Sequence, residues 1–116
     1  MRDRPPEDRP SAAQTAAENR VVLEGEVCRA PETRFTPARI PLTRFTLEHR
    51  SRQTAGGIQR EARLRLVVVA AGMELSRAAA GLHPGDRVRV EGFLARGSYQ
   101  AGDQELALQA DMLRRL

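Results

Sequence analysis

The sequence has no tryptophan, no lysine and a single cysteine, Cys28, among its 116 residues. One thiol excludes an intrachain disulfide framework, and no CxxC pair or set of spaced His and Cys residues indicates a metal site. We therefore expect neither a bound metal nor any other cofactor. No apolar run approaches the length that spans a bilayer, and the amino-terminal residues lack the apolar stretch of a secretory signal. We expect no membrane association and a cytoplasmic location.

Groups that could carry catalysis are also few. His49 and His83 are too isolated in the sequence to indicate a catalytic or metal-binding pair. Glu24 and Glu26 are paired acids of the kind that a nuclease uses, but no second acidic cluster completes a metal site. Cys28 ends an apolar segment and has no histidine in a partner context, which favours a core residue over a nucleophile. We expect a protein without enzymatic activity.

The charge of the chain is unevenly distributed. All 19 basic residues are arginines, which is typical of a GC-rich genome, and the net charge is +4. Residues 29–65 carry nine arginines against three glutamates, whereas residues 66–116 carry six basic and six acidic side chains. A local excess of this kind is typical of a protein that binds a polyanion. The alternative is a solvated basic surface without a partner.

A chain of this length corresponds to one domain. Residues 1–18 mix charged residues, proline and alanine without a hydrophobic period, which predicts a disordered amino-terminal tail. The pattern of a folded domain begins at Asn19, so we place that domain at residues 19–116.

The first part of the domain shows the alternation of two strands. The pattern predicts a half-buried strand over Arg20–Cys28, with Gly25 marking a sharp bend or a close approach of two backbones. The prolines of Arg29–Pro41 predict a basic loop. Alternation resumes over Leu42–Ser51, and the glycines of Arg52–Gln59 predict a flexible turn that joins two antiparallel strands.

The next stretch, Arg60–Ala71, begins basic and ends as an apolar run. In a strand, Arg63 and Arg65 lie on one face, where they can meet an anion, and the intervening leucine lies on the other. The apolar run Val67–Ala71 is typical of a strand that is covered on both sides. We expect it to be the central strand of a small barrel.

The remaining chain completes the pattern. A short helix is predicted over Gly72–Gly81, a turn over Leu82–Asp86, strands over Arg87–Ala95 and Gln104–Leu113, and a hairpin loop over Gly97–Asp103. Three strands, a helix and two strands give an all-β, five-stranded oligonucleotide-binding (OB) barrel, with one short helix between the third and fourth strands. In that fold the ligand lies on strands two and three and the loops one-two and four-five. The basic block falls largely on these elements.

Several segments resemble a known family. Asn19–Pro31, Ile40–Pro41 and Phe45–Ser51 are closely similar to the matching segments of the primosomal replication protein N (PriB) family, and Leu-Glu-His-Arg-Ser at 47–51 is the sharpest match. Gly92–Phe93 falls where that family has the same pair. The resemblance covers about residues 19–115 and leaves the amino-terminal tail outside it.

This resemblance implies a homodimer of OB barrels that binds single-stranded DNA. It further implies a bridge between DNA and the primosomal helicase at stalled forks, with no catalysis. The sequence departs from the family at two places. Arg63 stands where the family has a tryptophan early in strand three. The family's lysines in the four-five loop are replaced by Arg96, Tyr99 and Gln100, with acidic Asp103 and Glu105 nearby.

We predict a nucleic-acid site built mainly from arginines, because a guanidinium both pairs with phosphate and stacks on a base. Phe45 shares the parity of Leu47 and is expected in the core. Two alternatives remain: a primosome adaptor with weak DNA binding, and a general binding module for single-stranded DNA or RNA. The candidate site residues are Arg34, Arg44, Arg50, Arg52, Arg60, Arg63, Arg65, Arg96 and Tyr99.

Overall fold

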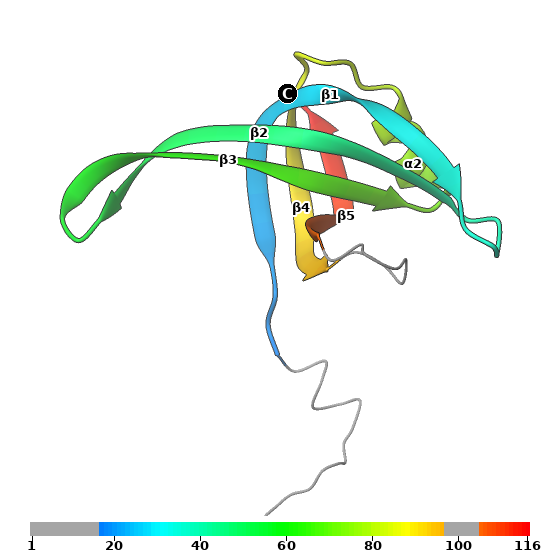
Figure 1. The fold of residues 1–116 in the computed structure, drawn as a ribbon, viewed down its shortest axis with the longest axis horizontal. Coiled ribbons are helices and arrows are strands. Elements are labelled where there is room, and N and C mark those ends of the chain that lie inside the picture. Colours follow the sequence, from blue (N-terminus) through cyan, green and yellow to red (C-terminus); the bar gives the residue numbers. More distant parts are fainter. Residues whose placement is uncertain (1–16, 97–104) are drawn as a thin grey trace, which may run out of the picture.

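A computed structural model of the protein describes residues 17–96 and 105–116. Within them the order of five strands and one short helix is the order that the sequence predicts (Figure 1). The elements are β1 (Val21–Phe35), β2 (Pro41–Ala55), β3 (Ile58–Ala71), α2 (Met73–Ala80), β4 (Arg87–Arg96) and β5 (Leu106–Arg115).

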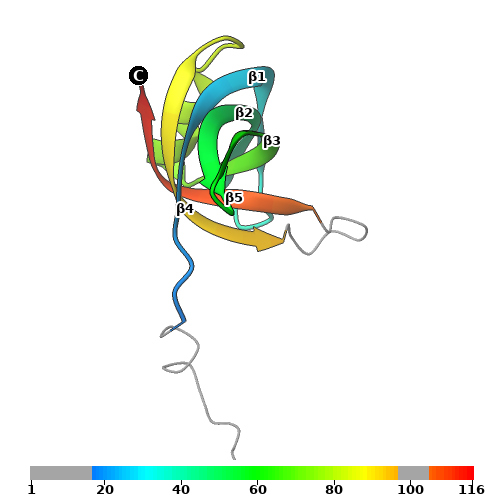
Figure 2. The ribbon, with the colours of Figure 1, turned by 90° about the vertical axis from the view of Figure 1, so that its left-hand side faces the viewer.

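The strands form a closed ring with the neighbour order β1-β2-β3-β5-β4. The ring closes where the first part of β1 pairs antiparallel with β4, and the one parallel pairing in this ring joins β3 to β5. Figure 2 looks along the β2–β3 hairpin and shows the strands arranged around the ring. This is the OB topology, so the predicted fold class is confirmed.

The core lies inside the ring because every strand alternates inward and outward side chains. In β4, for example, Val88 and Val90 are fully buried while Arg87 is exposed. Phe45 is only 2% exposed, which confirms its prediction as a core residue. The main buried hydrophobic residues are Val27, Phe45, Leu47, Val68, Ala70, Ala79, Leu82, Val88, Val90 and Leu108.

The predicted loop over Arg29–Pro41 is wrong. Strand β1 continues to Phe35, and β2 already begins at Pro41. Pro31 does not break the strand, because it lies in a register shift of the β1–β2 ladder between Arg29 and Glu32. A proline that cannot donate a hydrogen bond is tolerated at such an irregularity. The connection between the two strands is therefore only residues 36–40.

The turn predicted within Arg52–Gln59 joins β2 and β3 as an antiparallel hairpin, but it is shorter than that range. Ala55 pairs with Ile58, so the turn consists of Gly56 and Gly57 alone. Their φ angles are 61° and 78°, and two consecutive positive φ values are what a two-residue type I′ hairpin requires. The hairpin extends away from the barrel (Figure 1). We call residues 52–61 the arm, and all ten are exposed.

Gly25 marks the point where β1 changes its partner strand. Residues Val21 to Glu26 pair with β4, and from Glu26 onwards β1 pairs with β2. A Cβ atom on Gly25 would overlap the carbonyl oxygen of Glu48. The close backbone approach expected at this glycine is therefore confirmed.

The helix α2 is attached to the barrel through buried hydroxyl groups. The hydroxyl of Thr43 on β2 donates to the carbonyl oxygen of Ser76 (3.1 Å) and also hydrogen-bonds the Ser76 hydroxyl. The hydroxyl of Thr33 on β1 completes the chain, 2.8 Å from that of Thr43. Thr43 and Ser76 are 0% and 3% exposed, so the bonds between these two residues are shielded from water. Across the described ranges, no helix is long and apolar enough to cross a membrane.

Candidate nucleic-acid interface

The outward side chains of β2 and β3 form one continuous surface, because partners in an antiparallel ladder point to the same side of the sheet. We call this surface the basic face. It carries five arginines and two glutamates. On β2 it consists of Arg44, Thr46, Glu48, Arg50 and Arg52, and on β3 of Glu61, Arg63, Arg65, Val67 and Val69.

Two arginines oppose each other on this face. Arg50 and Arg63 are direct partners in the β2–β3 register, and both side chains are exposed. Like charges in this position destabilise a ladder by roughly 0.2–1 kcal/mol. Within residues 17–96 and 105–116, neither guanidinium forms an ion pair with an acid. An anion bound between them would relieve the repulsion.

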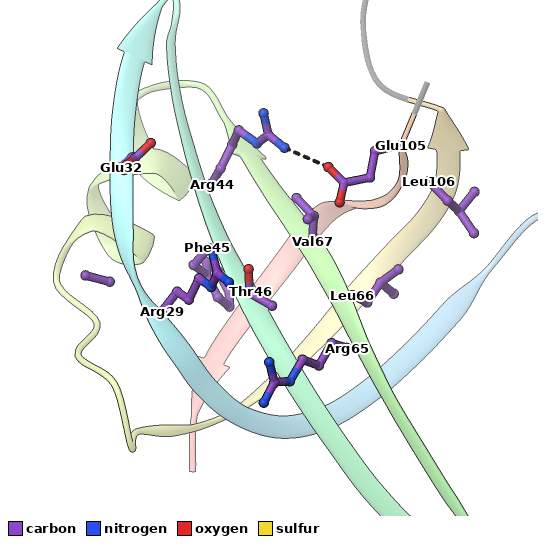
Figure 3. Close-up of a pocket in the computed structure, with 11 residues that line it drawn as sticks. Arg29, Glu32, Arg44, Phe45, Thr46, Arg65, Leu66, Val67, Glu105 and Leu106 are labelled. Atoms are coloured by element: carbon purple, nitrogen blue, oxygen red, sulfur yellow. Dashed lines mark hydrogen bonds and ion pairs between the residues drawn. The ribbon is translucent and has the colours of Figure 1, made fainter. Parts of the chain in front are cut away.

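A groove runs beside this pair, between β1, β2, β3 and the beginning of β5 (Figure 3). Its charged residues come from four segments that are far apart in the sequence. Thr46 and Val67, which are register partners, lie in its middle. The charged residues that line it are Arg29, Glu32, Arg44, Arg65 and Glu105.

Two groove arginines have acidic neighbours. Nη2 of Arg44 lies 3.2 Å from Oε1 of Glu105, and Nε of Arg65 lies 3.9 Å from Oε2 of Glu48. Such exposed pairs contribute little, because water and salt screen them. Arg29 forms no ion pair with any described acid. The groove and the basic face therefore keep several arginines, among them Arg29, Arg50 and Arg63, that have no acidic partner within residues 17–96 and 105–116.

The arginines on another part of the barrel behave differently. Arg20 donates to Asp111 (2.6 Å), and this hydrogen bond raises the pKa of Arg20 above its usual value. Arg89 donates to Glu24 (2.8 Å), which likewise raises the pKa of Arg89. These two cations have acidic partners within the protein, whereas Arg50 and Arg63 have none among the described residues.

Most of the sequence-predicted site residues are brought together. Arg34 lies on the same side of the sheet as the basic face, because its pair with Leu42 is two residues beyond the Glu32–Arg44 pair. Five candidates lie on the basic face itself, namely Arg44, Arg50, Arg52, Arg63 and Arg65.

Three candidates lie elsewhere. Arg60 pairs with Gln53 and therefore points to the other side of the arm, away from Arg50 and Arg63. Arg96 is the last residue of β4. Tyr99 lies outside the described residues.

Arg29 is a groove residue that sequence reasoning missed. The extension of β1 places it opposite Thr46, on the side of the basic face. The sequence reasoning assigned it to a loop because Pro31 follows two residues later. No pattern in the sequence reports the register shift that carries β1 past this proline.

The isolated histidine of the predicted second strand has a structural role. Nδ1 of His49 donates to the carbonyl oxygen of Glu24 (2.7 Å), and Nε2 lies 2.7 Å from the Ser51 hydroxyl. The bond to Glu24 ties β2 to β1 next to Gly25, and the contact with Ser51 lies within β2. In the part of the chain that the structure describes, no group of three or more His, Cys, Asp or Glu side chains could hold a metal ion.

The geometry is that of an OB barrel with a row of exposed arginines on strands β2 and β3. A family model described as another single-strand binding protein family matches residues 19–111. The chain belongs to this family. It is 38% identical over 95 residues to the replication restart protein PriB of Photorhabdus laumondii, covering 82% of this chain and 90% of that protein. It is 36% identical over 95 residues to PriB of Escherichia coli, covering 82% and 91%.

A solved structure has the same fold. The PriB protein from Ralstonia solanacearum superposes with a TM-score of 0.73 at 21% sequence identity, over 85% of this chain and 98% of that one. These comparisons confirm the family that the segments around Leu-Glu-His-Arg-Ser indicate, and they agree with the OB topology described above.

Proposed function

We propose that the protein binds single-stranded DNA without sequence readout and acts as an accessory protein of replication restart. The family and the curated PriB relatives support the general role. The single observation that supports the location of the site is the Arg50–Arg63 pair. Its two exposed cations face each other on the two strands that carry the ligand in an OB barrel.

The chemistry of the basic face suits a single strand. Phosphates would follow the arginines along β2, where the nine residues from Arg44 to Arg52 extend over about 26 Å. None of the ten side chains of the basic face is aromatic. The planar guanidinium of Arg63 would therefore serve both as a phosphate partner and as a stacking surface for a base. Neither interaction distinguishes one base from another.

Two further features are part of the proposal. The relatives carry the name of replication restart proteins, and we extend from this that the protein bridges DNA and the primosomal helicase. We also propose that it works as a homodimer. Catalysis has no place in this role, since the surface described above only binds and orients a strand.

The test is a titration of fluorescein-labelled oligo-dT at several salt concentrations. Phosphate neutralisation predicts that log K falls with log salt, with a slope of about 0.7 for each contact on a single strand. The double variant Arg63→Glu, Arg65→Glu should weaken binding by at least tenfold, while Arg77→Glu on α2 should have little effect. Binding that is absent or independent of salt would contradict the proposal. Equal effects of the two variants would move the site elsewhere.

A second function has specific support. Arg44 and Arg65 have acidic neighbours, and the basic face lacks an aromatic platform, so DNA binding could be weak and the protein chiefly an adaptor. A pull-down of the primosomal helicase, with and without DNA, separates the two functions. Helicase capture that survives the arginine substitutions, together with feeble DNA binding by the parent protein, favours the adaptor. Competition of oligo-rU against oligo-dT tests a preference for RNA.

A further inference from the structure

Glu105 places a carboxylate on the groove from the segment that leads into β5. Its Oε1 atom accepts a hydrogen bond from Nη2 of Arg44 at 3.2 Å, although the two residues are 61 positions apart in the sequence. Figure 3 shows this contact connecting β2 to the start of β5 across the groove. The other charged residues that line the groove come from β1 and β3.

A carboxylate and a phosphate compete for the same donors. Both are oxyanions that accept charge-assisted hydrogen bonds from the edge of a guanidinium. The Arg44 and Glu105 side chains are 43% and 57% exposed, so their pair is weak and open to exchange. A phosphate of a bound strand can therefore replace Glu105 as the partner of Arg44. Breaking the Arg44–Glu105 pair then reduces the net gain from that phosphate contact.

We propose that Glu105 is an affinity-setting residue, an internal competitor that masks Arg44 from the phosphates of a bound strand. The inference rests on the proposed function, since it names a residue that tunes the same site. Arg50 and Arg63 have no acidic partner among the described residues, so no internal carboxylate competes with the DNA phosphates for them. Arg44 contributes little while Glu105 is present. The affinity is thus held below what the arginines of the site could provide.

Glu32 supplies a matched control. It lines the same groove and is the direct register partner of Arg44, yet no ion pair joins the two. Removing either carboxylate changes the net charge of the groove equally. Only the loss of Glu105 unmasks Arg44, so a difference between the two variants isolates the masking from a general electrostatic effect.

The experiment measures the binding of labelled oligo-dT to the full-length parent, Glu105→Gln, Glu32→Gln, Arg44→Ala and the Arg44→Ala, Glu105→Gln double variant. Glu105→Gln should tighten binding about threefold to fivefold, the range that an exposed ion pair supports. Glu32→Gln should change it less than about twofold. The salt slope of Glu105→Gln should be steeper than that of the parent by about 0.7, the value of one added phosphate contact.

The double variant provides the decisive comparison. Arg44→Ala should cost less than about twofold in the parent, but should abolish the gain in the Glu105→Gln background, because coupled residues are not additive. An equal loss in both backgrounds, equal effects of Glu105→Gln and Glu32→Gln, or weaker binding by Glu105→Gln would each overturn the masking while leaving the DNA site in place. Absence of binding by the parent and every variant would overturn both proposals. Thermal melting confirms that the exposed substitutions leave the fold intact.

Discussion

Arg50 on β2 lies directly opposite Arg63 on β3, with no acid paired to either guanidinium in the described ranges. A ladder would be more stable with a neutral or an oppositely charged pair at this position, because like charges repel across a strand pair. A surface that keeps this repulsion has its charges free for a ligand. The stability of the sheet and the affinity of the site should therefore respond in opposite directions to changes here.

Substitution of Arg63 separates the two properties. Arg63→Ala should leave the free energy of unfolding unchanged or raise it by up to about 0.5 kcal/mol, because it removes a cross-strand repulsion. The same substitution should weaken oligo-dT binding severalfold and reduce the salt slope by about 0.7. Urea denaturation and anisotropy titration measure the two effects. Arg77→Ala on α2 is the control, and a parallel loss of stability and binding by Arg63→Ala would contradict this view.

Shortening the arm tests whether it serves the ligand or the fold. Ser51 and Ala62 are register partners four residues below the Ala55–Ile58 pair, so they are the same kind of ladder pair and can accept the same turn. Replacing residues 52–61 by Asn-Gly should change the free energy of unfolding by less than about 1 kcal/mol, because all ten residues are exposed and the core keeps its contacts.

The shortened protein should bind DNA more weakly, since it lacks Arg52 on the basic face. Its salt slope should be shallower by about 0.7 for each lost arginine contact. Circular dichroism and the same titration give the two measurements. A protein that fails to fold would show that the arm stabilises the barrel, in conflict with its exposure on both sides.

Gly25 should not tolerate a side chain. A Cβ atom there would overlap the carbonyl oxygen of Glu48, which belongs to the β2 backbone and cannot move without disturbing the sheet. Gly25→Ala should therefore lower the free energy of unfolding by about 3 kcal/mol. The control is Gly81→Ala, where the nearest atom, the carbonyl oxygen of Ala78, would lie 3.7 Å away. Similar melting temperatures for the two variants would contradict the close approach.

The buried hydroxyl chain should stabilise the attachment of α2. Thr43→Val keeps the shape of the side chain but removes its bonds to Ser76 and Thr33, which leaves buried polar groups without a partner. The free energy of unfolding should fall by about 2 kcal/mol. Thr46→Val is the same substitution on the groove side, where the hydroxyl has no hydrogen bond to any described residue, and it should be close to neutral. Denaturant titration of both variants compares their free energies of unfolding. The difference separates the loss of the buried hydrogen bonds from the effect of removing any hydroxyl.

Most of the fold could be predicted from the alternation of side chains along the strands. Alternation placed Phe45 inside and Arg63 and Arg65 outside because side-chain direction in a strand depends only on counting. Arg60 belongs to the candidate group only through its place in the basic block, because it has the opposite parity to Arg63 in the same strand. The charge block indicated the correct strands, but the face of each arginine required the register itself.

The errors arose where turn-forming residues lie inside strands. Pro31 and the Gly56–Gly57 pair indicate loops longer than those that exist, because the ladder continues through a register shift at the proline and up to a two-residue turn at the glycines. Arg29 was lost from the candidate site for this reason. The acidic partner of Arg44 could not be predicted either, because Glu105 approaches from a strand 61 positions later in the sequence.

Strand β1 is one continuous strand that pairs with β4 in its first part and with β2 in its second part. Up to Glu26 it seals the ring against β4, and beyond that point it carries Arg29 to the groove. A substitution that disturbs the β1–β4 pairing would thus shift the guanidinium of Arg29 without contacting it. A variant of the β1–β4 pairing that loses DNA affinity would then show an indirect effect transmitted along β1. It would not prove that the altered residue contacts the nucleic acid.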